Sequence, residues 1–415
     1  MARVIVVGGG AAGCIAALSA AQSGADTILL EQNEKLGKKL FITGKGRCNL
    51  TNAADMRTIQ EQVVSNGRFL YSAFRAYSNR DVMQCIESNG CPLKVERGGR
   101  VFPVSDHSSD VIAALERALR KAGVRICLHA AVKELLCEDG ETRRITGVCL
   151  ADGSVLKAER VIVATGGLSY PSTGSTGEGH RMLRQWGHCV TELYPSLTPL
   201  VLREQPIAAS LMGLSLKHVA IRILDEKKER FSSFGEMLFT HFGVSGPVIL
   251  SASAVIGPQL KKKNLRLEID MKPALSEEQL DQRLLRDFSG QQNRNLSNAL
   301  SDLFPARLIP EVIRQSGVEP DRKIRDMTRE ERGRMVQASK HLSYTVTGLR
   351  GFQEAIITKG GIDVKEVNPS TMESKRVPGL YLAGELLDLD AMTGGFNLQI
   401  AWSTGYLAGM HAALD

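Results

Sequence analysis

The first 31 residues constrain the fold most strongly, because they combine a buried strand, a glycine-rich turn and a helix of small residues. Residues 4–7 form a continuous apolar run, which is typical of a strand covered on both faces of a sheet. Gly8, Gly10 and Gly13 follow in the spacing G-x-G-x-x-G. This spacing predicts a tight strand-to-helix turn whose backbone N–H groups receive a pyrophosphate.

Glu31 strengthens this interpretation, because it ends a second apolar strand expected at residues 27–30. A carboxylate at this place accepts hydrogen bonds from a ribose hydroxyl in dinucleotide-binding folds. The glycine motif alone is common. Two strands, a helix and an acid in register favour a dinucleotide site over a glycine-rich turn in an unrelated α/β protein.

Composition is that of an ordinary soluble globular protein. The chain has 415 residues, of which 43% are hydrophobic and 23% charged, enough for two or three domains of roughly 100–200 residues each. No apolar run approaches the ~18–20 residues of a membrane span, and the first strand begins too early for a signal peptide. We therefore expect a cytoplasmic protein without membrane contact.

Cysteine content and charge exclude some function classes. The eight Cys include no C-x-x-C pair and no spacing typical of metal ligands, which predicts reduced thiols and no metal site. The net charge of +7 is compatible with an anionic substrate, nucleic acid or a membrane surface. It is equally compatible with cofactor phosphates and a solvated basic face. We interpret residues 261–263 and 322–334 as solvated faces rather than nucleic-acid contacts.

The order of the expected elements indicates a first domain made from both ends of the chain. We expect helices at 66–89 and 107–122, a β-hairpin at 93–103, strands at 124–128 and 131–137, and a second hairpin of 145–150 with 155–164. Short alternating segments after residue 190 predict a β-domain, and the polar helical pattern of 276–340 predicts an inserted helical subdomain. A strand at 379–383 and a final helix at 398–414 return to the first domain.

The C-terminal region has chemical features of its own. Asp388 and Asp390 follow the strand that ends at Gly384, and Gly394 and Gly395 precede the last helix. An acid after a strand can bind hydroxyls of a cofactor, and a glycine-rich helix N-terminus can present N–H groups to an anionic ring edge. The alternative is an ordinary strand–turn–helix with a glycine cap.

Longer stretches carry a specific resemblance. They are VVGGGAAG, GKKLFITGKGRCNLTN, VIVATGGLSYPSTGSTGEG, LFTHFGVSGPVIL, TKGGI and TMESKRVPGLYLAGELLDLDAMTGGFNLQIAWSTGYLAG. Together they span nearly the whole chain, which resembles the BaiN-like flavoprotein family, also described as NAD(P)/FAD-dependent oxidoreductase or aminoacetone-oxidase-like. Ala391, Met392 and Phe396 depart from the family's Gly- and Tyr-containing version where the block should meet the flavin, so substrate preference is expected to differ.

This resemblance implies an α/β fold: a glutathione-reductase-like Rossmann FAD domain with an inserted β-barrel-like domain and a small helical subdomain. We expect the FAD domain at residues 1–190 with 345–415, the β-domain at 191–274 with 341–350, and the helical subdomain at 275–340.

The resemblance also implies which residues bind FAD. Those expected at the ADP half are Gly8, Gly10, Ala12, Gly13, Glu31 and, for adenine, the backbone of Val132; those expected at the crossover are Thr165 and Gly166; those expected near the flavin and ribityl chain are Gly44, Arg47, Cys48, Asn49, Gly384, Glu385, Asp390, Gly394, Gly395, Asn397 and Leu398.

Two residues are candidates for catalysis. Cys48 is a candidate proton donor or thiolate beside the flavin, with Lys45 and Arg47 expected to lower its pKa. Its alternative role is a small residue packed under the ring. His241 is a candidate substrate contact, or a loop histidine without a catalytic role. Disulfide reductases of this fold have a C-x₄-C pair where this chain has only Cys48, so dithiol chemistry is not expected.

The source of electrons is less explicit. The sequence has no second strand–G-x-G-x-x-G–helix unit for a nicotinamide cofactor. NAD(P)H is therefore expected to dock transiently as the electron donor, or an external reductase is expected to supply electrons.

The leading hypothesis is an FAD-dependent oxidoreductase that uses NAD(P)H to reduce an activated C=C bond in a small molecule of the bile-acid or steroid-enone type. Alternatives are a ribosomal-RNA dihydrouridine synthase, an amine (aminoketone) oxidase that produces hydrogen peroxide, and a non-catalytic FAD-bound sensing protein. The aromatic content of 5% disfavours RNA, because few side chains can stack on bases, whereas the basic charge favours it.

Overall fold

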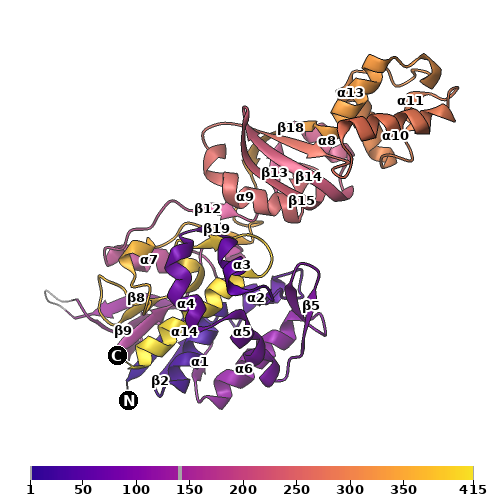
Figure 1. The fold of residues 1–415 in the computed structure, drawn as a ribbon. Coiled ribbons are helices and arrows are strands. Elements are labelled where there is room, and N and C mark those ends of the chain that lie inside the picture. The colour runs from indigo at the N-terminus through magenta and orange to yellow at the C-terminus, as the bar shows by residue number, and fades with distance from the viewer. Residues whose placement is uncertain (1, 139–142, 415) are drawn as a thin grey trace. The chain divides into compact units, whose positions relative to one another are not determined.

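The computed structural model describes residues 2–138 and 143–414 and divides into two compact units. Unit 1 comprises Met1–Ser196 and Phe352–Asp415, and unit 2 comprises Leu197–Gly351 (Figure 1). Unit 2 therefore interrupts unit 1 in the sequence. Among the described residues, no helix has the length and apolarity that crossing a lipid bilayer requires.

A five-stranded parallel sheet in the order β20-β11-β1-β2-β7 is the centre of unit 1. Its strands are β1 (Arg3–Val7), β2 (Asp26–Leu30), β7 (Arg125–Cys127), β11 (Arg160–Val163) and β20 (Leu380–Leu382). Residues 4–7 are buried, as the apolar run of β1 predicts for a strand covered on both faces. The sheet begun by the N-terminal strand is completed by a strand from the C-terminal region.

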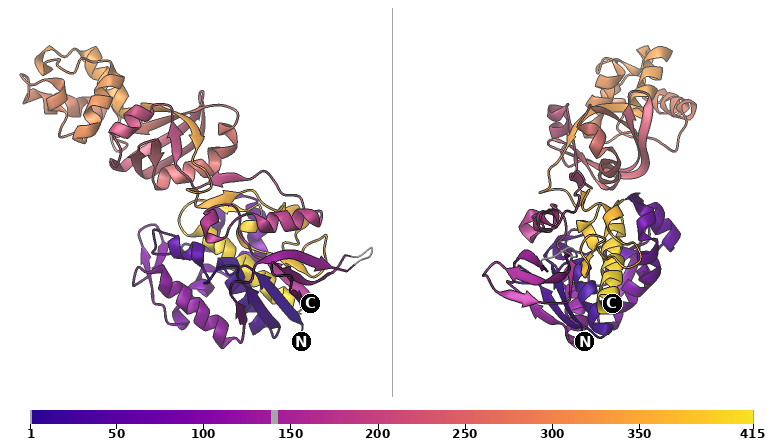
Figure 2. Two further views of the ribbon diagram at one scale, coloured as in Figure 1. Left: turned by 180° about the vertical axis from the view of Figure 1, so that it is seen from behind. Right: turned by 90° about the vertical axis from the view of Figure 1, so that its left-hand side faces the viewer.

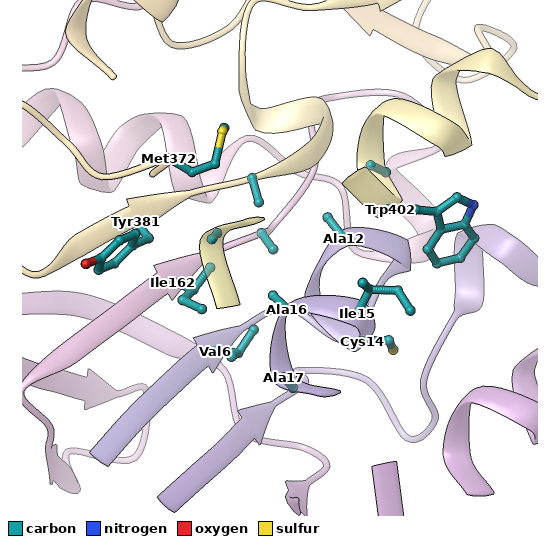
Figure 3. Packing of buried hydrophobic residues seen from close by; sticks show 14 of the residues in the cluster. Val6, Ala12, Cys14, Ile15, Ala16, Ala17, Ile162, Met372, Tyr381 and Trp402 are labelled. Atoms are coloured by element: carbon teal, nitrogen blue, oxygen red, sulfur yellow. The ribbon is translucent and has the colours of Figure 1, made fainter. Parts of the chain in front are cut away.

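Helices α1 (Ala11–Gln22) and α14 (Phe396–Leu414) pack closely beside this sheet. A Cβ at Gly405 would overlap the carbonyl oxygen of Ala12, and a Cβ at Gly409 would overlap that of Ala16. Glycine at both positions lets the two backbones approach. Figure 3 shows Ala12, Ala16 and Trp402 in this core, and in Figure 2 the yellow C-terminal helix lies among N-terminal elements.

Smaller sheets surround the parallel sheet of unit 1. An antiparallel sheet has the order β10-β9-β8, another has β3-β6-β5, and two ribbons pair β12 with β19 and β21 with β4. Their strands are β3 (Thr51–Asn52), β4 (Val63–Ser65), β5 (Leu93–Glu96), β6 (Arg100–Pro103), β8 (Val132–Cys137), β9 (Ile145–Leu150), β10 (Val155–Lys157), β12 (Tyr194–Ser196), β19 (Ile357–Lys359) and β21 (Asp390–Ala391). The remaining helices of unit 1 are α2 (Lys38–Ile42), α3 (Met56–Glu61), α4 (Tyr71–Ala76), α5 (Asn79–Ser88), α6 (Ser108–Lys121) and α7 (Glu178–Gln185).

For two elements of unit 1, the extents predicted from the sequence are wrong. The single strand at 155–164 divides into β10, which pairs with β9, and β11, which joins the parallel sheet. The single helix at 66–89 divides into a 3₁₀ turn, α4 and α5. The break before α5 is stabilised by a capping box, in which Ser78 accepts from the backbone of Asp81 and the Asp81 carboxylate accepts from the backbone of Ser78.

Unit 2 contains a closed antiparallel barrel in the order β13-β16-β15-β14-β17-β18. Its strands are β13 (Leu200–Leu202), β14 (Ser215–Asp225), β15 (Lys228–Thr240), β16 (Gly243–Ser245), β17 (Leu265–Asp270) and β18 (Leu342–Leu349). The helices of unit 2 are α8 (Gln205–Ser210), α9 (Pro247–Leu260), α10 (Glu277–Ser289), α11 (Leu296–Ala299), α12 (Ile309–Ser316) and α13 (Arg329–Lys340). One apolar core continues from barrel residues such as Phe239 into helical residues such as Leu284 and Val312. The expected fold class, a Rossmann domain with an inserted barrel and a helical subdomain, is confirmed.

Candidate functional site

The turn between β1 and α1 is closely packed on one side and open on the other. Gly8 has a φ of 106°, and a Cβ there would lie 2.6 Å from the carbonyl oxygen of Ala164. A Cβ at Gly13 would overlap the carbonyl oxygen of Gly8. Gly10 is the N-cap of α1, and within the described residues no atom lies within 4 Å of its Cβ position. The turn therefore leaves space for a phosphate group where the N–H groups of the helix N-terminus are free of a side-chain cap.

Glu31 lies beside this turn and is 7% exposed. One carboxylate oxygen accepts from the backbone N–H of Gly9 at 2.7 Å. The other accepts from the backbone N–H and the side-chain amide of Asn33, at 2.8 and 2.6 Å. A carboxylate has about four acceptor positions, so these three bonds leave room for one hydroxyl donor.

The segment after β11 approaches the same turn. The Oγ1 atom of Thr165 is buried and has no hydrogen-bond partner within the described part of the chain. Gly166 has a φ of 75°, which favours glycine. A buried hydroxyl without a partner is uncommon in a folded protein, so this atom fits a site whose bound group supplies the partner. Val132, expected near adenine, is half-buried at the start of β8.

The loop around Cys48 has an unusual backbone. Gly44, Lys45, Gly46 and Cys48 all have φ between 58° and 83°. The backbone N–H of Cys48 donates to the carbonyl of Thr43 at 2.9 Å. Left-handed conformations at Lys45 and Cys48 are disfavoured for residues with a Cβ, and such strain concentrates at binding and catalytic sites.

The expected lowering of the Cys48 pKa is wrong. The side chain is fully buried, and burial raises the pKa of its thiol to about 12. Arg47 does not oppose this effect, because its guanidinium pairs with Glu96 and Asp106 and lies 4.1 Å from the ring centroid of Phe102. These contacts bind the loop to the β5–β6 hairpin. Arg47 thus positions the loop.

Asp390 is fully buried and paired with a cation. The ammonium group of Lys359 lies 3.0 and 3.2 Å from its two carboxylate oxygens and 2.7 Å from the hydroxyl of Ser65. This cluster joins β4, β19 and β21, which are far apart in the sequence. Nearby Asp388 has a raised pKa, mainly because its carboxyl group is partly buried.

Several other expected cofactor residues bind the backbone of the C-terminal region. The Asn397 amide donates to the carbonyl of Ala391 at 2.8 Å and its Oδ1 accepts from the Ala391 N–H at 2.9 Å. The N–H of Gly384 donates to Thr404 Oγ1 at 3.0 Å. A Cβ at Gly395, whose φ is 95°, would overlap the backbone carbonyl of Thr51. The segment 384–397 is thereby fixed in shape.

Glu385 connects two further residues that the sequence interpretation did not single out. Its carboxylate accepts from the Lys39 ammonium at 2.5 Å and from the Thr358 N–H at 2.8 Å. Thr358 Oγ1 in turn accepts from the backbone N–H groups of Leu168 and Ser169, at 2.8 and 3.1 Å. Lys39, Thr358 and Lys359 all lie in stretches quoted for the family resemblance, which is the signal that could have identified them.

The structure brings most of the expected residues into unit 1. Gly8, Gly10, Ala12, Gly13, Glu31, Gly44, Arg47, Cys48, Asn49, Val132, Thr165, Gly166, Gly384, Glu385, Asp390, Gly394, Gly395, Asn397 and Leu398 all belong to it. His241 belongs to unit 2, where it is exposed between β15 and β16 and lies edge-on to Phe242, with ring centroids 4.9 Å apart.

A separate hollow of about 540 Å³ lies against the other end of α1. It is lined by Ser19 and Gln22 of α1 and by the stacked rings of Tyr77 and Tyr406, whose centroids are 4.5 Å apart. Because Ser19 and Gln22 lie in the last turns of α1, this hollow is distinct from the glycine turn at the helix start.

The parallel sheet and its glycine turn define a Rossmann-fold protein with a dinucleotide-type turn. The chain belongs to the family described as HI0933-like protein Rossmann domain, whose model matches residues 2–411. The flavoprotein resemblance inferred from the sequence is thus confirmed at the level of the family.

Curated relatives cover almost the whole chain. A 3-dehydro-bile acid delta(4,6)-reductase of Clostridium scindens is 33% identical and covers 100% of this chain and 99% of its own. A ribosomal RNA dihydrouridine synthase of Haemophilus influenzae is 32% identical, covering 97% of this chain and 96% of its own. Among solved structures, a 3-ketosteroid delta1-dehydrogenase from Sterolibacterium denitrificans has a TM-score of 0.54 at 14% identity, with 100% of both chains covered, which shows a shared fold.

Proposed function

We propose that this chain is an FAD-dependent oxidoreductase that saturates a C=C bond conjugated with a carbonyl group, with NAD(P)H as donor. The observation that carries the proposal is the glycine turn, which is closely packed at Gly8 and Gly13 and open at Gly10. The Thr165 hydroxyl beside it has no hydrogen-bond partner among the residues that the structure describes, which supports a bound group at this place. When bound, FAD supplies the two electrons as a hydride equivalent.

The chain's own residues have distinct roles in this proposal. The N–H groups at the start of α1 bind the pyrophosphate, and Glu31 accepts from a ribose hydroxyl. Thr165 donates to the cofactor through its hydroxyl. The loop of residues 44–49 and the segment 384–397 bound the flavin end, and Arg47 and Asn397 keep their shapes fixed.

Cys48 is better suited to packing than to acid–base chemistry. A general acid or base works best when its pKa lies near the working pH and its atom reaches the substrate. Burial raises the pKa of this thiol to about 12 and leaves none of the side chain exposed. We therefore assign Cys48 the packing role. In this proposal the proton comes from a bound water molecule or from another group near the substrate.

The names of the relatives favour C=C reduction over amine oxidation. A delta(4,6)-reductase and a dihydrouridine synthase both add a hydride and a proton across a C=C bond that is conjugated with a carbonyl. The hydride goes to the carbon remote from the carbonyl and the proton to the carbon beside it. We propose a small-molecule enone of the bile-acid or steroid type as the leading substrate.

Uridine in ribosomal RNA is the second candidate substrate, and the charge distribution favours it. Unit 2 contains 24 Lys and Arg against 18 Asp and Glu, a net charge of +6 out of +7 for the whole chain. A basic unit attached to a nearly neutral cofactor unit is an arrangement suited to a polyanionic substrate.

The test is anaerobic absorbance of the purified protein. We expect a visible flavin spectrum that bleaches on addition of NADH or NADPH and recovers when a steroid enone or a uridine-containing RNA is added. Bleaching by an aminoketone, with hydrogen peroxide formed in air, would instead identify an amine oxidase. A protein that co-purifies with no flavin, and takes up none when FAD is added, would contradict the proposal.

A further inference from the structure

The outer face of the β14–β15 hairpin presents an aromatic pair to solvent. Phe234 is 57% exposed, and its ring stacks at 18° on the ring of His218, with centroids 6.3 Å apart. Phe234 lies opposite Ala220 in the strand ladder. Exposed aromatic rings on a strand face are the feature on which proteins stack unpaired nucleobases.

The tip of the same hairpin carries charges of both signs, because residues 225–230 contain three Lys or Arg and three Asp or Glu. Lys227 and Lys228 are exposed and form no ion pair with any described residue. Next to the tip, buried Asp225 pairs with Arg230 and with Lys263, whose ammonium lies 2.5 Å from the carboxylate. This contact brings the hairpin tip beside the turn that follows α9.

The two adjacent segments, 225–230 and 261–266, contain seven Lys and Arg against three Asp and Glu. Their combined charge is +4, and all of it comes from residues 261–266, because residues 225–230 are neutral overall. The ion pair of Asp225 with Lys263 places the two segments side by side, although they are far apart in the sequence.

The aromatic pair and the hairpin tip both belong to the β14–β15 ladder. Between them, Arg222 faces Ser232 across the ladder and pairs with Glu268 on β17. Six residues of β15 separate Phe234 from Lys228, a distance of about 20 Å at the usual rise of a strand. We name His218, Lys227, Lys228, Phe234 and Lys262 the hairpin face.

We propose that the hairpin face binds single-stranded RNA, with its lysines at the phosphates and Phe234 and His218 stacked on a base. This inference extends the second candidate function, because it assigns RNA binding to named residues. It rests on the proposed function for the reaction that the RNA undergoes, whereas the binding itself does not depend on that function. RNA is favoured over an anionic membrane because an exposed aromatic pair lies on the same hairpin as exposed lysines, and a lipid surface has no bases to stack on such a pair.

The experiment measures binding of a fluorescently labelled, uridine-rich single-stranded RNA to the full-length protein by anisotropy at several salt concentrations. The variants are K227A/K228A/K262A and F234A. The matched control is K121A/K157A/K365A, which removes three exposed lysines of unit 1.

The triple variant should reduce the slope of log affinity against log salt by about 2, since each lost phosphate contact contributes about 0.7 for single strands. F234A should weaken binding about tenfold with the salt slope unchanged, because stacking does not release counterions. The control triple variant should bind as the wild type does.

Three results would overturn the inference: no RNA binding by the wild type at low salt, equal loss in the control and hairpin variants, or binding to phosphatidylserine vesicles without binding to RNA. Enone-dependent reoxidation of the reduced protein is measured on the same samples. If the protein reduces the enone but does not bind RNA, only this inference is contradicted. If the protein binds RNA but never binds FAD, only the proposed function is contradicted.

Discussion

At the residue scale, the glycine turn depends on missing side chains, and two of its glycines are required for different reasons. Gly13 is required by the protein itself, because a Cβ there would overlap the Gly8 carbonyl oxygen. Gly10 has a φ of −83° and no described atom near its Cβ position, so an added methyl would meet a bound group rather than the described part of the chain. Substitution at the two positions should therefore separate folding from cofactor binding.

We expect Gly13→Ala to destabilise the protein by about 1–3 kcal/mol, the usual cost of overpacking a tight contact. Gly10→Ala should cost less than about 1 kcal/mol, the scale of a helix-cap change, yet retain little flavin. Urea unfolding of the flavin-free protein and the flavin content per chain are the measurements. Full flavin content in Gly10→Ala would contradict the assignment of the open space to a pyrophosphate.

The buried thiol of Cys48 leads to a prediction about the stability of the folded chain at alkaline pH. Burial raises the pKa of its thiol from 9.0 to about 12, so the folded chain binds this proton more tightly than the unfolded chain. The corresponding stability is complete below pH 9 and is lost as the pH rises toward 12.

We expect Cys48→Ala to lower the free energy of unfolding at pH 7, because packing is lost. Between pH 9 and 11 the free energy of unfolding of the variant should fall less steeply than that of the wild type, with the two slopes differing by about 1.4 kcal/mol per pH unit. Chemical unfolding at several pH values checks this. Parallel pH curves for the variant and the wild type would show that the thiol is not protonated and buried in solution.

The sequence interpretation at this scale was right where partners are local and wrong where they are distant. The residues Gly8 and Gly13 are neighbours in the chain, so their spacing alone predicts the turn. The partners of Arg47 are Glu96 and Asp106, which lie about 50 residues or more further along the chain. The loop sequence alone does not identify them. Lys359 was missed for the same reason.

At the element scale, local signals determine where helices and strands end. The break between α4 and α5 follows from the Ser78 capping box, a signal present in the sequence but outweighed by the apolar periodicity around it. The 155–164 strand divides because its first part is largely exposed and its second part is buried. Strand pairing, unlike strand propensity, depends on distant residues, so the sequence did not show this division.

Helix α13 offers a stabilising substitution. Gly333 lies inside this helix and is not in a left-handed conformation, and no atom of the described part of the chain lies within 4 Å of its Cβ position. Gly333→Ala should raise the free energy of unfolding by about 0.5–1 kcal/mol, because alanine loses less backbone entropy in a helix. Thermal unfolding measures the effect, and Thr328→Ala, which removes the capping box of the same helix, should act in the opposite direction.

At the scale of the whole molecule, Lys359 and Asp390 join segments that are far apart in the chain. Lys359→Met would leave the fully buried Asp390 carboxylate without its cation, at a cost of about 3–5 kcal/mol. Lys359→Met with Asp390→Asn should cost less than Lys359→Met alone, since the buried charge is then absent. Urea unfolding of both variants and of Asp390→Asn tests this coupling, and simple additivity would contradict it.

The close fit of α1 against α14 has a consequence for biosynthesis. Ala12 and Ala16 leave the ribosome long before Gly405 and Gly409, the residues that receive them. At 5–20 residues per second, the interval from the end of α1 to the start of α14 lasts about 20–75 s. Throughout that time the nascent N-terminal half lacks both its last helix and the strand β20, so its apolar surface is uncovered. Unit 1 therefore completes its core only after nearly the whole chain has been synthesised.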